Sequence, residues 1–116
     1  MAYTRIPLSG AAHGAAVSIT ATSSTAGTVV HTATTSATLV DVVTLYAHNS
    51  STSGSVTLTL NWSSTAAANK IVQDIPNRSG LIPVVIDGLI RNTLVIDAAA
   101  SVTAKIAIHG FVNRSA

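Results

Sequence analysis

The chain has 116 residues, enough for one domain, and only 9% of them are charged, against about 25% in ordinary soluble domains. It contains no Cys and no Glu, which excludes disulfides, thiolate metal sites and cysteine nucleophiles. The formal charge of +2 comes from six cations spread singly, whereas a nucleic-acid-binding surface needs a concentrated basic patch. We therefore expect no nucleic acid partner.

Neither a membrane span nor a targeting segment is expected from the sequence. The apolar runs have the length of strands, far below the roughly 18 residues of a membrane helix. The N-terminus lacks a basic start followed by a continuous apolar stretch. A surface with so little charge gives weak protection against association, which favours a protein packed against neighbours. Abundant Ser and Thr keeping a free monomer in solution is the alternative.

The first half of the chain reads as strands separated by Ser-, Thr- and Gly-rich loops. Residues 15–20 form a weak strand, and in a second strand Val29, His31 and Ala33 alternate with Val30 and Thr32. A long third strand covers residues 39–48. The polar run "NSSTSG" is a hairpin loop, and it leads into "VTLTLNW", where Val56, Leu58, Leu60 and Trp62 share the core face.

The second half continues the pattern, after "STAAANK", which is a loop or a single helical turn. Strands are predicted over residues 70–76, 81–86, 89–98 and 101–112. Asp87-Gly88 predicts a tight turn between the second and third of these. Pro76 and Pro83 place their strands at sheet edges or at strand starts.

About eight short strands with regular turns predict a single antiparallel β-sandwich, jelly-roll-like in architecture. Residues 1–14 are expected as an N-terminal arm and residues 15–116 as the sandwich domain. The last strand should place Val102, Ala104, Ile106, Ile108 and Val112 on the core face, which turns Phe111 outward. Tyr46 also points outward if Val43, Leu45 and Ala47 point inward. An outward aromatic is either a partner contact or a lone exposed ring, and both interpretations stay open.

No assembled catalytic motif is found, so we expect no enzyme, no catalytic residue and no cofactor. The four Asp residues lie far apart in sequence and are interpreted as solvated turn and strand residues. The four His residues, His13, His31, His48 and His109, are the only credible set of metal ligands, and the last three lie on predicted strands. Isolated His on a sheet face is ordinary surface, so no metal site is predicted. Whether one of them binds an ion at a symmetry axis stays open.

Residues 40–114 resemble small virion proteins of tailed bacteriophages, through the segments "VTLYAHN", "GLIRNTLVI" and "IHGFVNR". The resemblance implies a β-sandwich or jelly roll that coats the capsid or sits on the tail, often as a trimer. The function it favours is capsid decoration, in which the protein cements the major capsid lattice. The alternative is a tail or fibre component with a receptor- or glycan-binding module.

Under this interpretation the partners are copies of the chain and the major capsid protein or another virion protein. The protein would be found in the virion, after assembly in the host cytoplasm. The arm, which precedes any clear strand, is the predicted anchor. The outward-pointing aromatic residues are further predicted contacts. The predicted partner contacts are Tyr3, Arg5, Ile6, Tyr46 and Phe111.

Overall fold

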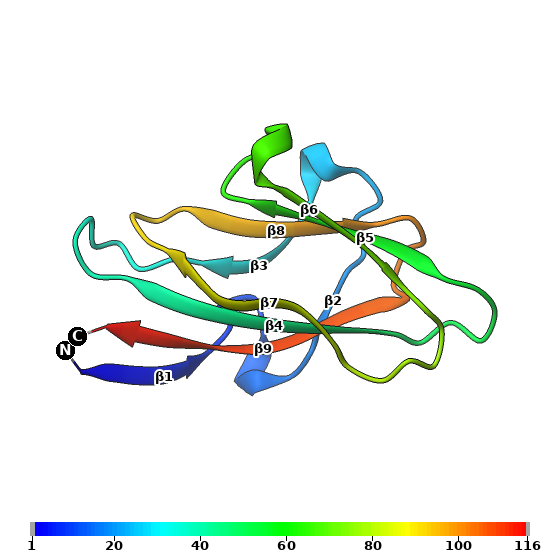
Figure 1. Ribbon diagram of the computed structural model, residues 1–116, viewed down its shortest axis with the longest axis horizontal. Helices are drawn as coiled ribbons and strands as arrows, with labels where there is room; N and C mark the ends of the chain where they lie inside the picture. Colours follow the sequence, from blue (N-terminus) through cyan, green and yellow to red (C-terminus); the bar gives the residue numbers. More distant parts are fainter. Residues whose placement is uncertain (1, 116) are drawn as a thin grey trace.

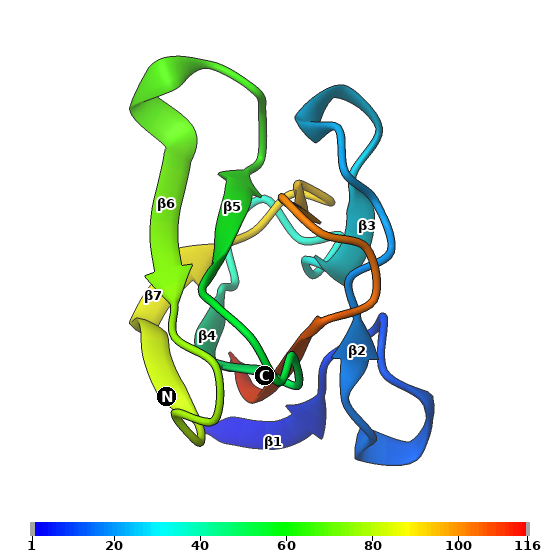
Figure 2. The ribbon, with the colours of Figure 1, turned by 90° about the vertical axis from the view of Figure 1, so that its right-hand side faces the viewer.

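Two antiparallel β-sheets pack face to face in the computed structural model, which describes residues 2–115 (Figure 1). Sheet A has the strand order β1-β9-β4-β7, with β2 also paired to β9, and sheet B has the order β3-β8-β5-β6. Figure 2 shows the two layers along the long axis. The strands are β1 Tyr3–Pro7, β2 Val17–Ser18, β3 Thr28–Thr32, β4 Asp41–Asn49, β5 Val56–Trp62, β6 Lys70–Ile75, β7 Ile82–Ile90, β8 Val95–Ala100 and β9 Ile106–Ser115.

This topology is a jelly roll, as the sequence predicts. Strands β1 and β2 pair with successive stretches of β9, so together they occupy one edge position of sheet A. Counted this way the nine strands fill eight positions, four in each sheet, and adjacent positions are antiparallel throughout. The chain passes repeatedly from one sheet to the other, which is the arrangement of the double-sheet jelly roll.

The core lies between the sheets and is made of the alternate positions of each strand. Val43, Leu45 and Ala47 of β4 are fully buried, as the alternation predicts, and they face Leu58 and Leu60 of β5 across the core cluster. A Thr or Val on the opposite face keeps the strand conformation because both are β-branched. The solvent-facing positions therefore need no charged residue for the strand to form.

The predicted tight turn at Asp87-Gly88 is wrong. Both residues lie inside β7, where the pairing with β4 shifts register and Asp87 has a φ of 54°. The Asp-Gly pair tolerates positive φ, and here a bulge in an edge strand uses that tolerance instead of a hairpin. The turn lies five residues later, at Asn92 and Thr93, whose φ values are 63° and 58°.

The last strand is also shorter than predicted. It begins at Ile106, because residues 101–105 form a turn in which Ala104 has a φ of 58°. Val102 is 45% exposed and Ala104 is also exposed, so neither is a core residue, whereas Ile106, Ile108 and Val112 are buried as predicted. Alternation alone does not show where a strand stops, since a turn can continue the same apolar–polar pattern.

The segment predicted as an arm contributes to the sandwich itself. Tyr3–Pro7 forms β1 and pairs with β9 residue by residue, from Tyr3 opposite Ser115 to Pro7 opposite Phe111. Leu8, which follows, is 1% exposed in the core. Residues 3–8 are therefore an edge strand and a core anchor of the domain.

The two prolines stand where the sequence places them. Pro83 lies in β7, the free edge strand of sheet A, and Pro76 directly follows β6, the edge strand of sheet B. The segment "STAAANK" contains one turn of 3-10 helix, Ala67–Asn69. These two edge strands border the same open side of the sandwich.

Candidate interaction surfaces

The outer face of sheet A brings together most of the predicted contact residues. Residues of β1, β4 and β9 that alternate with the core positions share this face, and the register places Arg5 opposite Asn113 and Tyr46 opposite His109. We call it the aromatic face; it consists of Tyr3, Arg5, Tyr46, His48, His109, Phe111 and Asn113. Ile6 points to the other side, where it packs against the core, so it is not part of this face.

Two contacts hold the Arg5 side chain on the aromatic face. Its Nε donates a hydrogen bond of 3.1 Å to Asn113 Oδ1, and its guanidinium carbon lies 4.2 Å from the centroid of the Phe111 ring. Stacking of this kind contributes about 0.5–1 kcal/mol at an exposed site. The result is an ordered patch of one Arg and one aromatic ring. Such residues are enriched in protein–protein interfaces.

The three candidate ligands on predicted strands are separated by the fold. His48 and His109 lie side by side on the aromatic face, with ring centroids 5.2 Å apart, whereas His31 is fully buried between the sheets. Within residues 2–115 no three His, Cys, Asp or Glu residues are close enough to share a metal ion. A three-histidine zinc site is therefore not formed by the described part of one chain.

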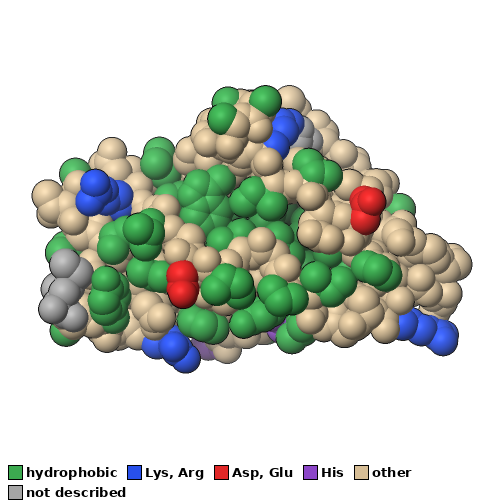
Figure 3. All heavy atoms as spheres, in the orientation of Figure 1, with side chains coloured by type: hydrophobic (Ala, Val, Ile, Leu, Met, Phe, Trp, Pro, Cys, Tyr) green, Lys and Arg blue, Asp and Glu red, His purple; other side chains and the backbone are tan. Residues whose placement is uncertain are grey.

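A second surface lies on the open side, between the edge strands β6 and β7. Hydrophobic side chains gather in the hollowed middle of this side, with Lys and Arg at its margins (Figure 3). Two adjoining hollows, of about 280 and 430 Å³, share Trp62 and Leu89. We call this the apolar groove; its main lining residues are Trp62, Ile71, Val85, Leu89 and Leu94.

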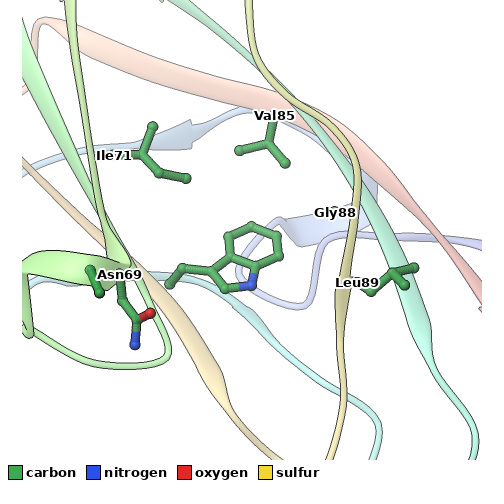
Figure 4. A pocket seen from close by; sticks show the side chains of 7 residues that line it. Asn69, Ile71, Val85, Gly88 and Leu89 are labelled. Carbon is green, nitrogen blue, oxygen red and sulfur yellow. The ribbon is translucent and has the colours of Figure 1, made fainter.

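Close contact with a glycine fixes the position of the indole in the groove. A Cβ on Gly88 would lie 2.7 Å from Cη2 of Trp62, so only glycine lets the ring lie against β7. Figure 4 shows Ile71, Val85 and Leu89 around this space and Asn69 at one side. Leu89 is 63% exposed. It also lines a third hollow with Tyr3 and Asp87, which joins the groove to the aromatic face.

Sequence reasoning missed the groove because it treats Trp62 as a core residue. The alternation does aim Trp62 at the interior, but β5 lies beside the edge strand β6, where the sandwich opens. Nothing in the sequence indicates that Leu89 and Leu94 are exposed. They flank the turn at Asn92, whereas the sequence pattern predicts a turn at Asp87-Gly88.

A buried ionic cluster joins the two sheets. Asp41 of β4 is fully buried and accepts two hydrogen bonds from Arg114 of β9, at 2.7 Å and 2.8 Å. It also accepts a hydrogen bond of 2.9 Å from Nε2 of His31 on β3 and one of 3.0 Å from the Thr34 amide. The interpretation of the Asp residues as solvated is therefore wrong for Asp41. Its neighbours come from strands distant in sequence, so no local pattern reveals them.

The His31–Asp41 pair resembles a catalytic His–Asp dyad only in its residue types. The amide of Ser9 donates to His31 Nδ1 at 3.0 Å, which fixes the proton on Nε2, where it is donated to Asp41. Both nitrogens of the fully buried His31 ring are therefore already hydrogen-bonded. The Ser9 hydroxyl accepts the amide hydrogen of Thr32 at 2.6 Å and has no hydrogen bond to the ring. The arrangement holds the sheets together and offers no free base.

Acid should destabilise the fold through Asp41. Burial alone would raise the pKa of this carboxyl, but hydrogen bonds from Arg114, His31 and the Thr34 amide together lower the pKa below its ordinary value of 3.8. The stabilisation is therefore fully present above pH 3.8, and it is lost as the pH falls through the lower folded-state value. Urea midpoints measured from pH 7 down to pH 2 should fall in this acid range, and the fall should be smaller in Asp41→Asn.

No family model, curated protein or solved structure matches this chain. In the described residues no helix has the length and apolar character needed to cross a membrane.

Proposed function

We propose that the chain is a structural virion protein of a tailed bacteriophage, which decorates the capsid and stabilises the major capsid lattice as a trimer. One observation carries the proposal: a largely apolar surface, which includes the charged residues Arg5, Asp87 and Arg91, runs from the aromatic face over the edge of β7 into the apolar groove. Leu89 belongs to all three hollows along this path. Surface of this kind is typical of an interaction site.

The fold supports the same proposal without deciding it. Jelly rolls build viral capsid domains, but also lectins and cupins, so the fold gives an analogy and the surface gives the argument. A stable interface buries about 800 Å² per partner, about one-seventh of the 5846 Å² exposed by this chain. The aromatic face and the apolar groove offer contact surfaces for two different neighbours.

The proposed mechanism is the bridging of neighbouring capsomers. Each contact adds buried area that must be exposed again before two capsomers separate, so binding of the decoration protein shifts the equilibrium towards the intact shell. The low charge of the surface reduces the desolvation cost of such contacts, because few ionic groups lose their water.

Copy number in purified particles tests the role. The chain should be present in virions produced from the genome that encodes it, in hundreds of copies and in a fixed ratio to the major capsid protein, as quantified by mass spectrometry. A handful of copies would place it on the tail or fibre instead. Absence from particles would contradict a virion role altogether.

Substitutions on the aromatic face test the contact itself. We expect the double substitution Tyr3→Ser and Phe111→Ser to weaken binding to undecorated capsids by about 30-fold, or about 2 kcal/mol, as for a typical interface hot spot. Val102→Ser is the matched control, because Val102 is 45% exposed but lies in the turn before β9. Binding is measured by co-sedimentation. Deletion of residues 1–8 is unsuitable, since it would remove β1 and the core residue Leu8.

A further inference from the structure

We propose that His48 and His109 form a two-ligand site for a divalent transition-metal ion such as Zn²⁺, Ni²⁺ or Cu²⁺. The two imidazoles are adjacent on the aromatic face, with ring centroids 5.2 Å apart and planes inclined by 37°. This inference is independent of the capsid role, because it depends only on the geometry of one chain.

The separation of the rings fits shared coordination. Zn²⁺ binds histidine nitrogen at about 2.0–2.1 Å, and with a tetrahedral angle two such ligands place their ring centroids about 5 Å apart. Small changes in the side-chain torsions are enough to turn one nitrogen of each ring towards a common point, since the terminal torsion of His is broad. The backbone need not move.

The backbone beneath the pair is the most restrained part of sheet A. His48 lies on β4 and His109 on β9, and these are the two strands of the sheet that have a partner on both sides. The register sets Tyr46 opposite His109 and His48 opposite Ala107, so the two histidines are diagonal neighbours on one face. Ligands on such strands are preorganised, which lowers the entropic cost of binding an ion.

Both rings are available for a ligand. Each is partly exposed, and no hydrogen bond from either ring to residues 2–115 is found. His31 differs in both respects, because it is fully buried and its two nitrogens are already bonded. His13 is exposed on a 3-10 turn, Ala12–Gly14. It has no second histidine in ring contact, so it is the natural control.

The donor set selects the kind of ion. Neutral imidazole suits Zn²⁺, Cu²⁺ and Ni²⁺, while Mg²⁺ and Ca²⁺ prefer oxygen ligands. Two protein ligands leave positions open to water or to a group from another molecule. We therefore expect one ion per chain, and we expect Cu²⁺ to bind more tightly than Ni²⁺ or Zn²⁺.

Isothermal titration of the untagged chain with Zn²⁺, Ni²⁺ and Cu²⁺ tests the site, since a polyhistidine tag would itself bind these ions. We expect saturable binding at one ion per chain, weakened at least about tenfold in His48→Ala and in His109→Ala. Loss of a group that only supports a ligand already costs 10–100-fold, so loss of the ligand should cost no less. His13→Ala should bind like the parent chain, and Mg²⁺ should not bind.

Thermal unfolding gives a second readout that also checks the fold of each variant. The metal should raise the midpoint of the parent chain and of His13→Ala, and leave that of the double variant His48→Gln and His109→Gln unchanged. Absence of saturable binding would overturn the proposal. So would binding that survives both single substitutions, or binding lost equally in His13→Ala.

Discussion

Replacing Asp41 with Ala should lower the free energy of unfolding by about 3 kcal/mol. Breaking a buried ion pair by removing one partner costs about 3–5 kcal/mol, because the remaining group stays buried without compensation. We expect the lower end of this range, since the Arg114 side chain is 36% exposed and can regain water. The buried His31 Nε2 and the Thr34 amide lose their acceptor, and they supply most of the cost.

Urea and thermal unfolding measure this effect, which should lower the midpoint by roughly 12 °C for a domain of this size. Asp74→Ala is the matched control, because Asp74 is exposed and accepts one hydrogen bond, 2.7 Å from the Thr57 hydroxyl. It should show less than a third of the loss. A double-mutant cycle with Arg114→Met isolates the coupling between the two charges. Equal losses in Asp41→Ala and Asp74→Ala would contradict the role of the buried cluster.

Replacing Gly110 with Ala should also destabilise the protein strongly, by about 3 kcal/mol. Gly110 lies in β9 opposite Leu45 of β4, and an added Cβ would collide with the carbonyl oxygen of Thr44. That oxygen belongs to the backbone of a central strand, so the two strands must separate to make room. Overpacking of a core costs about 1–3 kcal/mol, and we expect the upper end because the obstacle is main chain.

Gly54→Ala separates this packing effect from a general loss of glycine. A Cβ on Gly54 would meet no atom within 4 Å, but its φ of +86° imposes backbone strain on alanine. That strain costs about 1–2 kcal/mol. Denaturant unfolding should therefore rank Gly110→Ala below Gly54→Ala in stability. The reverse order would show that the sheet adjusts to the added methyl group.

The architecture of the sandwich could be predicted because it depends on local alternation. In β4 the apolar residues Val43, Leu45 and Ala47 fall on every second position, and a pleated strand must bury them together. This pattern also turns Tyr46 outward. Strand boundaries were harder to predict, because Asp87-Gly88 suits a hairpin turn and a bulge equally well.

The surfaces could be predicted only in part. The sequence identifies Tyr3, Arg5, Tyr46 and Phe111 as candidate contacts one at a time, and the pairing of β1, β9 and β4 gathers them on one face. The expected arm also includes Ile6, yet in a strand adjacent residues point to opposite faces, and Ile6 packs against the core. The aromatic face is therefore a product of strand register.

The sequence by itself determined the all-β class, the two-layered sandwich and the scarcity of charge, since these follow from composition and from a period of two along each strand. Tertiary structure alone decided the buried cluster of Asp41, His31 and Arg114, the apolar groove and the pairing of His48 with His109. Each of these joins residues from different strands. Which strands become neighbours depends on packing the whole chain, and no local stretch of sequence contains that information.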